Sequence, residues 1–234
     1  WEGPVSWCPV VLKEGDRFRM WYRGRNDGGP GRPSVTCYAE SRDGIHWERP
    51  SLGLFAFEGT TDNNICIDNR LLNNVSVFRD ERPGVAEEER YKAVGRWSMG
   101  KPAQIYGMAS PDGIHWTLIQ NEALIVAQES DPQFDSPFSA FWDAERQCYF
   151  LYARGWYPNG PEHRIRAIRY TTSQDFLHWK EWQYIEITGE SRWSEHLYTN
   201  SAHPYYRAPY YLMFPKRYLP ERTFSSDWPH AGQS

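Results

Sequence analysis

A seven-residue motif occurs three times along the chain, and this repeat limits the possible folds more than any other feature. The copies are Ser41-Arg42-Asp43-Gly44-Ile45-His46-Trp47, Ser110-Pro111-Asp112-Gly113-Ile114-His115-Trp116 and the altered Ser173-Gln174-Asp175-Phe176-Leu177-His178-Trp179. Their starts lie 69 and 63 residues apart. Each copy follows an apolar or alternating run, so we interpret the motif as a turn between two strands. Aspartate would cap the turn, glycine would supply a positive φ, and tryptophan would pack back onto the strands.

A second pattern precedes each copy: a strand, a short turn, and another strand rich in aromatic residues. We predict these strand pairs at residues 7–12 and 18–22, 75–79 and 91–97, 138–142 and 148–153, and 203–206 and 210–214. Three or four strands in units of about 60 to 70 residues are typical of β-propeller blades. A β-sandwich also has many short strands, but it does not predict a turn that recurs at blade-length intervals.

The sequence therefore predicts an all-β propeller that forms a single domain over residues 1–234. The blade units are expected at about 1–70, 71–130 and 131–190, with a partial unit at 191–234. Because the fourth unit ends before its own copy of the turn motif, we expect part of a closing blade to be absent. Residues 219–234 are interpreted as a loop leading towards it.

Charge and composition exclude several classes of partner. The net charge is −4, so no overall positive field would attract nucleic acid or an anionic membrane, and no apolar run is long enough to cross a bilayer. Four widely separated cysteines show no metal-ligand spacing and are expected to be buried thiols. Aromatic residues reach 16% of the chain, which suits both sheet cores and platforms on which sugar rings stack.

The copy at residues 173–179 resembles the Ser-x-Asp-Leu-x-x-Trp turn of five-bladed propeller glycosidases, a group that contains arabinanase-like, xylosidase-like and invertase-like families. The resemblance covers roughly residues 1–218 and implies a five-bladed β-propeller. The turn is also similar to the Asp-box of sialidases, although one residue between aspartate and glycine is missing here. The chain lacks the Asn-Asp-Pro-Asn and Arg-Asp-Pro segments of invertases, which argues against fructoside chemistry.

The resemblance implies three catalytic carboxyl groups around the propeller axis. In the arabinanase-like pattern the first blade supplies a base, the third an aspartate that tunes the acid, and the fourth a glutamic acid that donates the proton. The matching residues are Glu2, Asp135 and Glu195, with Asp131 as a competitor for the second role. Glu2 departs from the family, which has aspartate in that position. Aromatic and polar neighbours of Glu195 would raise its pKa through partial burial.

Aligning the blades indicates a further set of candidate binding residues. The second strand of each unit ends in a base, and the four bases are Arg23, Arg96, Arg154 and Lys216. They could ring one pocket and bind an anionic substrate, or they could form structural ion pairs; both readings stay open. His196, beside Glu195, and Asp62, in a Thr-Asp-Asn-Asn loop, are additional candidates. The three motif histidines are interpreted as structural.

These observations favour a glycoside hydrolase that acts by general acid/base catalysis with inversion. An anionic carbohydrate and a neutral one both stay open as its substrate. Inversion requires the two acting carboxyls to stand roughly 6.5 to 9.5 Å apart, so that water fits between them. The alternatives are a non-catalytic carbohydrate-binding or protein-binding propeller and a sialidase-like Asp-box enzyme, since a fold alone does not fix a function. No cofactor is expected, while a structural or axial calcium ion stays open. A glycan substrate would favour a secreted or periplasmic location, and the oligomeric state stays open.

Overall fold

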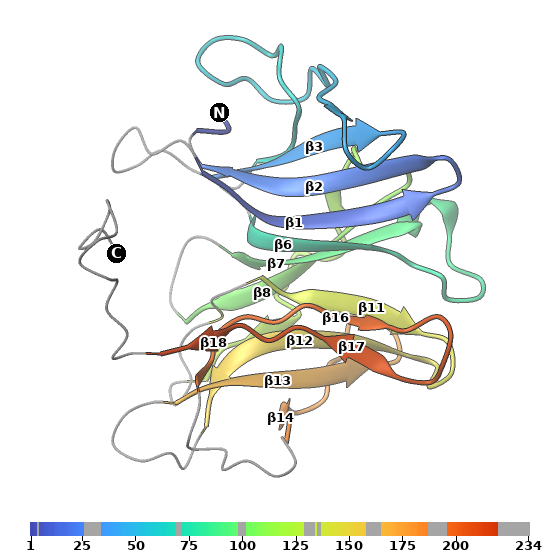
Figure 1. Ribbon diagram of the computed structural model, residues 1–234, viewed down its shortest axis with the longest axis vertical. Coiled ribbons are helices and arrows are strands. Elements are labelled where there is room, and N and C mark those ends of the chain that lie inside the picture. Colours follow the sequence, from blue (N-terminus) through green and yellow to red (C-terminus); the bar gives the residue numbers. More distant parts are fainter. Residues whose placement is uncertain are drawn as a thin grey trace.

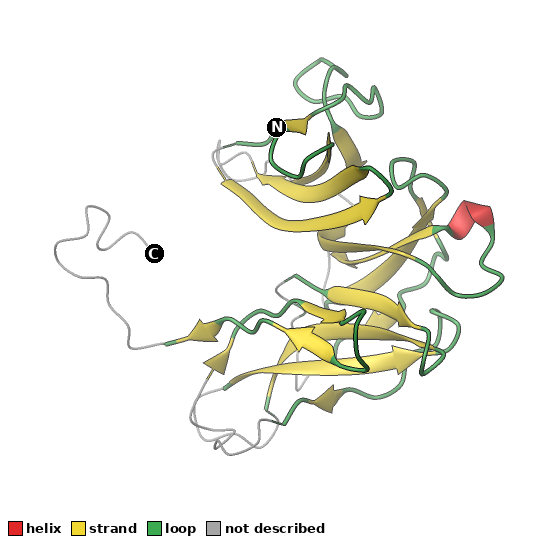
Figure 2. Ribbon diagram, turned by 45° about the vertical axis from the view of Figure 1, so that its right-hand side comes forward, coloured by secondary structure: helices red, strands yellow, loops and turns green. Residues whose placement is uncertain are grey.

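The computed structural model is built almost entirely from antiparallel β-sheets (Figures 1 and 2). It describes residues 1–3, 5–25, 34–68, 72–97, 102–128, 134, 137–157, 165–186 and 196–219. Within these ranges one short 3-10 helix, η1 (Glu87–Glu89), interrupts the strands. The described residues contain no helix that is long and apolar enough to cross a membrane.

Three blades of four or five strands follow one another along the chain, and two further pairs of strands come after them. The first blade contains β1 (Val5–Glu14), β2 (Arg17–Arg25), β3 (Val35–Ser41), β4 (Trp47–Glu48) and β5 (Ile65–Asp68). The second contains β6 (Leu72–Arg79), β7 (Tyr91–Trp97), β8 (Gln104–Ser110), β9 (Thr117–Leu118) and β10 (Ile125–Val126). The third contains β11 (Ser139–Asp143), β12 (Cys148–Trp156), β13 (Arg166–Ser173) and β14 (Gln183–Tyr184). The fourth unit pairs β16 (Ala202–Pro204) with β17 (Tyr211–Met213), and β15 (His196–Leu197) with β18 (Arg217–Tyr218).

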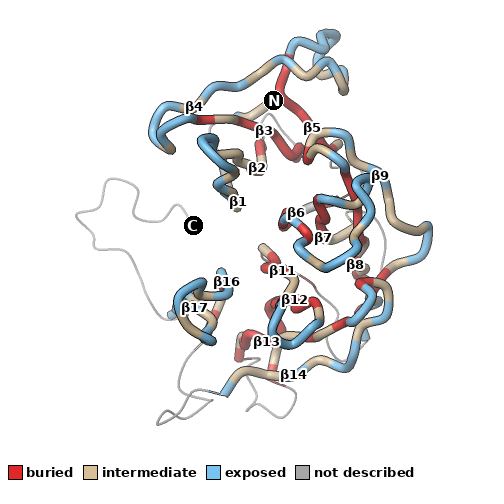
Figure 3. The backbone as a smooth tube through the Cα atoms, turned by 90° about the vertical axis from the view of Figure 1, so that its right-hand side faces the viewer, coloured by how far each residue is buried: buried red, intermediate tan, exposed pale blue. Residues whose placement is uncertain are grey.

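The sheets are arranged around a common centre, towards which β1, β6, β11 and β16 face (Figure 3). Apolar residues fill the spaces between neighbouring blades. One cluster joins Trp21 and Tyr38 of the first blade to Val77 of the second, and another joins Phe150 of the third to Leu197 of the fourth. This arrangement confirms the prediction of an all-β fold of the five-bladed propeller class.

The three copies of the turn motif adopt the same conformation. In each copy the serine Oγ accepts a hydrogen bond from the backbone N–H three residues later, and the aspartate Oδ1 accepts two more. The histidine Nδ1 lies 2.7 Å from the aspartate Oδ2 in all three turns. Gly44 and Gly113 have φ of +75°. The predicted roles of aspartate and glycine are therefore confirmed.

Phe176 occupies the glycine position of the third copy and still has a φ of +71°. A side chain fits there because the facing residues differ between blades. In the second copy, a Cβ on Gly113 would lie 2.7 Å from Trp21 Cζ2, so this turn requires glycine. The Phe176 ring lies against Gly107, where a Cβ would come within 3.0 Å of Phe176 Cε1, and the ring belongs to a core cluster that also contains Val94. Burial of the phenyl ring offsets the backbone strain of a few kcal/mol or less.

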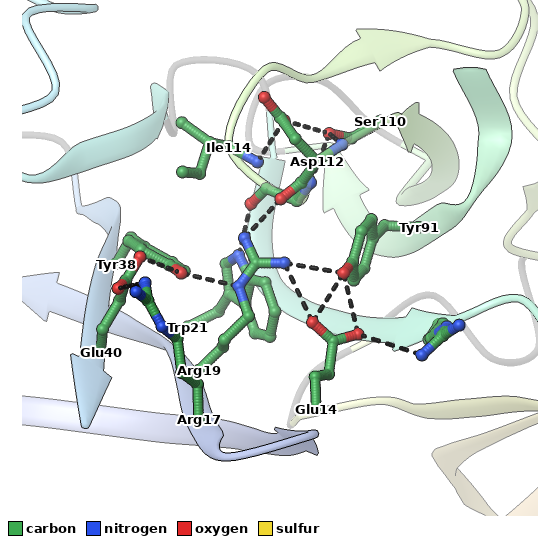
Figure 4. Close-up of polar contacts among 12 residues, drawn as sticks. Glu14, Arg17, Arg19, Trp21, Tyr38, Glu40, Tyr91, Ser110, Asp112 and Ile114 are labelled. Carbon is green, nitrogen blue, oxygen red and sulfur yellow. Dashed lines mark hydrogen bonds and ion pairs between the residues drawn. The ribbon is translucent and has the colours of Figure 1, made fainter. Parts of the chain in front are cut away.

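Arg19 connects the first blade to the turn motif of the second blade through hydrogen bonds (Figure 4). Its guanidinium donates to Tyr38 Oη at 2.6 Å, to Tyr91 Oη at 2.8 Å and to the Asp112 carbonyl, and it pairs with Glu14 at 3.2 Å. Four partners from two blades therefore fix this one side chain.

A hydrogen bond between a carboxylate and a tyrosine recurs at each contact between blades. Glu14 ends β1 and accepts from Tyr91 at 2.7 Å; Asp80 follows β6 and accepts from Tyr149 at 2.6 Å. Asp143 ends β11 and accepts from Tyr211. In each pair the tyrosine comes from the second strand of the next blade. These contacts lie at the far ends of the inner strands, away from the candidate residues at their beginnings.

Candidate functional site

A cavity of about 1180 Å³ occupies the centre of the propeller, where the inner strands face one another. Its walls come from β1, β6, β11 and the β16–β17 unit. Figure 3 shows how the backbones of these strands are arranged around the centre. Near the beginnings of these strands the wall is formed by Cys8, Val75, Phe138 and Asn200. A cavity of this size and position is where a propeller would bind a ligand.

The inner strands β1 and β6 contain a β-bulge at the same place. The strand register shifts between Trp7 and Val10 in β1 and between Asn73 and Ser76 in β6. Bulges often lie beside functional sites, because the extra residue redirects neighbouring side chains.

The four repeated bases occupy matching positions but have different surroundings. Arg23 lies opposite Trp7 and donates to Asn74 Oδ1 at 3.0 Å and to Ser34 Oγ at 2.7 Å. Arg96 lies opposite Asn73, and its buried Nε has no hydrogen-bond partner in the described part of the chain. Of these two bases, Arg23 therefore belongs to the contact between the first and second blades.

The other two bases gather around Tyr198 together with a third, Arg166. The guanidinium of Arg154 lies 4.8 Å from the ring centre of Tyr198, that of Arg166 lies 5.5 Å away, and Lys216 Nζ lies 6.0 Å away. Arg154 is buried whereas Lys216 is exposed. Arg166 also lies 4.1 Å from the ring centre of Tyr218. We call Arg154, Arg166 and Lys216 the cation cluster; it concentrates positive charge on one side of the propeller.

His196 borders the cation cluster. Its Nδ1 accepts a hydrogen bond from the Arg166 backbone N–H at 3.3 Å. Burial lowers the pKa of His196 below its usual value, and the charge of Arg166 lowers it further. The imidazole is therefore neutral at pH 7 and can act as a hydrogen-bond acceptor.

Glu2 lies against the face of the first blade and is not among the residues that line the central cavity. Its carboxylate pairs with Arg49 at 2.6 Å, accepts a hydrogen bond from Tyr22 Oη, and lies 3.5 Å from Asn64 Nδ2. Burial raises the pKa of Tyr22, and the hydrogen bond to Glu2 raises it further. The phenol therefore remains a donor to Glu2 at neutral pH.

Of the remaining candidates, Asp62 alone lies among the described residues, and it does not line the cavity. Glu195, Asp135 and Asp131 fall outside the described residues. Asp62 is exposed in its loop, and its backbone N–H donates to Thr60 Oγ1 at 3.0 Å, as a turn residue would. Within the described ranges, no group of three or more His, Cys, Asp or Glu side chains is placed to hold a metal ion.

Sequence reasoning missed two polar residues, Arg166 in the cation cluster and Asn200 in the cavity wall. Neither belongs to a pattern that recurs in the other blades, so aligning the repeats could not identify them.

Comparison with curated proteins finds distant and uncharacterized relatives. No family model matches the chain. Uncharacterized proteins from two Mycobacterium tuberculosis strains, CDC 1551 and H37Rv, are 26% identical over 149 residues. The match covers 62% of this chain and 45% of each relative, so it spans less than half of their length.

Solved structures share the fold at low sequence identity. An N-acetylgalactosamine deacetylase from F. plautii, in complex with blood group B trisaccharide, has a TM-score of 0.55 and 13% identity, covering 85% of this chain and 58% of its own. A glycoside hydrolase has a TM-score of 0.53 and 18% identity, covering 85% and 61%. Sucrose-6-phosphate hydrolase from Lactobacillus gasseri has a TM-score of 0.51 and 14% identity, covering 75% and 33%. The fold of this chain therefore resembles that of glycoside hydrolases.

Proposed function

We propose that residues 1–234 act as one propeller unit of a glycoside hydrolase that cleaves a glycosidic bond with inversion. The observation that carries this proposal is the central cavity of about 1180 Å³, walled by the inner strands of successive blades. Aromatic and polar side chains line it, as a site for a sugar requires. The resemblance of the fold to glycoside hydrolases supports the same class.

The proposed chemistry needs one protonated and one ionised carboxyl group in different environments. Glu195 is assigned as the general acid, Asp135 as the residue that orients or tunes it, and Glu2 as the base. Two observations bear on these roles. Glu195 directly precedes His196, which borders the cation cluster, and Arg49 pairs with the Glu2 carboxylate at 2.6 Å. A base must be ionised, so the pairing with Arg49 suits the role of Glu2.

An acidic sugar, such as a uronic acid or a sulfated sugar, is the proposed substrate class. The cation cluster supports this proposal, because Arg154 and Arg166 carry planar guanidinium groups that can hold a carboxylate or sulfate with two hydrogen bonds. The whole chain carries a net charge of −4, so this positive charge is local. None of the three residues is among those that line the central cavity, so such a field would favour an anion beside Tyr198, between the third blade and the fourth unit.

The decisive experiment replaces Glu195 by Gln, which keeps the shape and removes the proton donor. Release of reducing sugars is first screened with the unmodified protein on plant, algal and host glycans. On the glycan that is cleaved, Glu195→Gln should slow the reaction by roughly 10² to 10⁴, and a poor leaving group should show the larger effect. Glu122→Gln, an exposed position in the second blade, serves as the control. An unchanged rate for Glu195→Gln would remove this residue from the mechanism.

A non-catalytic carbohydrate-binding propeller is the second candidate, and the surroundings of Glu2 favour it. Both carboxylate oxygens of Glu2 are engaged by Tyr22 and Arg49, which is typical of a structural residue. If a glycan binds the unmodified protein but no glycan in the screen is cleaved, the binding function is favoured over hydrolysis.

A further inference from the structure

Tyr218 is an exposed tyrosine that three neighbours hold in place beside the cation cluster. The residue is 36% exposed. The guanidinium of Arg166 lies 4.1 Å from the centre of its ring, the Tyr198 ring is stacked at 5.7 Å, and the His196 ring lies 5.8 Å away. A side chain that is already fixed loses little conformational freedom when a ligand packs on it. Tyr218 therefore offers a rigid aromatic surface to the C–H face of a sugar ring.

The imidazole of His196 uses one nitrogen within the fold and leaves the other available. The Arg166 backbone N–H donates to Nδ1 at 3.3 Å, and Arg166 Nη1 lies 3.5 Å from the same nitrogen. Because a neutral imidazole carries its hydrogen on one nitrogen, these contacts place the hydrogen on Nε2. Within the described ranges Nε2 has no hydrogen-bond partner, and it is not buried. His196 therefore presents one N–H donor to a ligand.

His196, Lys216 and Tyr218 lie on one face of the pair formed by β15 and β18. His196 is directly opposite Tyr218 in the register. The Tyr198 N–H donates to the Lys216 carbonyl at 2.7 Å, so the pairing continues to Lys216, two residues before Tyr218. Opposite residues, and residues two apart on a strand, project from the same face. Thr199, which lines the central cavity, directly follows Tyr198, so this face adjoins the cavity.

We propose that Tyr218 and His196 bind the ring of an acidic sugar whose charged group is held by the cation cluster. The C–H face of the ring packs on Tyr218, and one hydroxyl accepts a hydrogen bond from His196 Nε2. The acidic group binds Arg166 and Lys216: in the described part of the chain neither Arg166 Nη2 nor Lys216 Nζ donates a hydrogen bond, and both residues reach solvent. This inference rests on the proposed function and deepens it by assigning the neutral part of the sugar.

The first experiment removes the aromatic ring of Tyr218. Binding of D-glucuronate, D-galacturonate and D-glucose 6-sulfate to the unmodified protein is measured by calorimetry, and the sugar that binds most tightly is used for the variants. Tyr218→Leu should weaken its binding by about fivefold or more, whereas Tyr218→Phe keeps the ring and should bind it like the unmodified protein. Tyr206→Leu is the matched control, because Tyr206 is also exposed and also lies beside an arginine, 5.1 Å from the Arg207 guanidinium. It should leave the affinity unchanged.

The second experiment compares two amides at position 196. Glutamine can place its N–H₂ group where the imidazole has Nε2, so His196→Gln keeps the donor that faces the ligand. Asparagine is shorter and can replace only Nδ1, so His196→Asn keeps the contact with Arg166 and loses that donor. His196→Asn should weaken binding of the same sugar by about tenfold, while His196→Gln should stay within about twofold of the unmodified protein.

Each result supports or overturns the assignment. Unchanged affinity of Tyr218→Leu, or an equal loss for Tyr206→Leu, would remove Tyr218 from the site, and equal losses for His196→Asn and His196→Gln would reject the donor. Melting temperatures show whether each variant folds; if Tyr218→Leu does not, Tyr218→Val, which suits a strand, decides by the same measurement. No binding of any of the three sugars to the unmodified protein also overturns the inference, even if a neutral glycan is cleaved. Binding that depends on both residues without cleavage of any glycan would keep this inference and reject hydrolysis.

Discussion

Tyr149 donates a hydrogen bond of 2.6 Å to Asp80 Oδ2 across the contact between the second and third blades. The same oxygen pairs with Lys92 Nζ at 2.6 Å, and the Lys92 and Asp80 side chains are only 2% and 0% exposed. Burial raises the pKa of Tyr149, and its hydrogen bond to Asp80 raises it further, so the phenol stays protonated. A buried ion pair is tolerated when further hydrogen bonds complete it, and Tyr149 supplies one.

Replacing Tyr149 by Phe removes this donor and should lower the free energy of unfolding by about 1.5 to 3 kcal/mol, the range for a hydrogen bond to a charged group. Urea unfolding at pH 7 measures the change. Tyr170→Phe is the control, because the Tyr170 hydroxyl bonds to Gln183 in an exposed position, and it should cost less than about 0.5 kcal/mol. Equal losses for the two variants would show that the contact between the blades adds no stability.

Gly113→Ala should destabilise the protein by more than Gly84→Ala does. Both glycines have positive φ, +75° and +78°, so both substitutions strain the backbone, by roughly 1 kcal/mol. Only the Cβ at position 113 meets a neighbour, Trp21 Cζ2 at 2.7 Å, whereas position 84 has nothing within 4 Å. The clash should add about 1 to 3 kcal/mol to the loss at position 113, as judged by chemical denaturation. Similar losses at the two positions would contradict the tight contact with Trp21.

Acid should weaken the fold between about pH 4 and pH 2. Burial of the Asp112 carboxyl raises its pKa, but the hydrogen bonds that it accepts from His115, Ile114 and Ser110 outweigh burial and hold the pKa at about 2. The hydrogen bonds of the other two turns also lower the pKa values of Asp43 and Asp175. The unfolded chain binds protons first, near pH 4, so stability is present above that pH and is lost as the pH falls towards 2.

This pH dependence is measured from urea midpoints at intervals between pH 2.5 and pH 6. Asp112→Asn should reduce the slope, because asparagine does not titrate. Asp16→Asn, in the exposed turn between β1 and β2, is the control outside the motif. A slope that Asp112→Asn leaves intact would mean that the turn carboxylates do not cause the acid sensitivity.

Arg166→Gln should weaken binding of D-glucuronate by about 1.5 to 3 kcal/mol and change binding of D-glucose little, because only the former carries a carboxylate for the cation cluster. Arg207→Gln removes an exposed arginine that also lies over a tyrosine ring, 5.1 Å from the ring centre of Tyr206, and it should affect neither ligand. Calorimetric titration gives both affinities. Equal losses on glucuronate and glucose would reject a preference for anionic ligands.

The fold was predictable from sequence because its strongest constraint is local. The backbone bonds of the turn depend on the serine and aspartate of the motif, which are present in all three copies, including the one with Phe176. The accommodation of Phe176 itself was not predictable. It depends on Gly107, which lies in another blade and far away in the sequence and leaves room for the phenyl ring.

The candidate site was less predictable, because repeats show what the blades share and a binding site depends on where they differ. Arg23 and Arg154 occupy matching strand positions, yet Arg23 binds Asn74 and Ser34 while Arg154 lies against Tyr198. Asn200 lies in the cavity wall, and neither polar atom of its buried amide has a partner in the described structure. Neither property is visible in a linear sequence.

The space behind the turn motif is filled in two different ways in the second and third copies. This difference restricts which substitutions the chain can accept during evolution. Trp21 with Gly113 and Phe176 with Gly107 are both closely packed pairs, and exchanging one member alone produces either a collision or a void. We therefore expect the residue at position 113 to covary with that at position 21 among relatives of this chain, and position 176 to covary with position 107. A mutation that enlarges one partner would become acceptable only on a background in which the other has already become smaller.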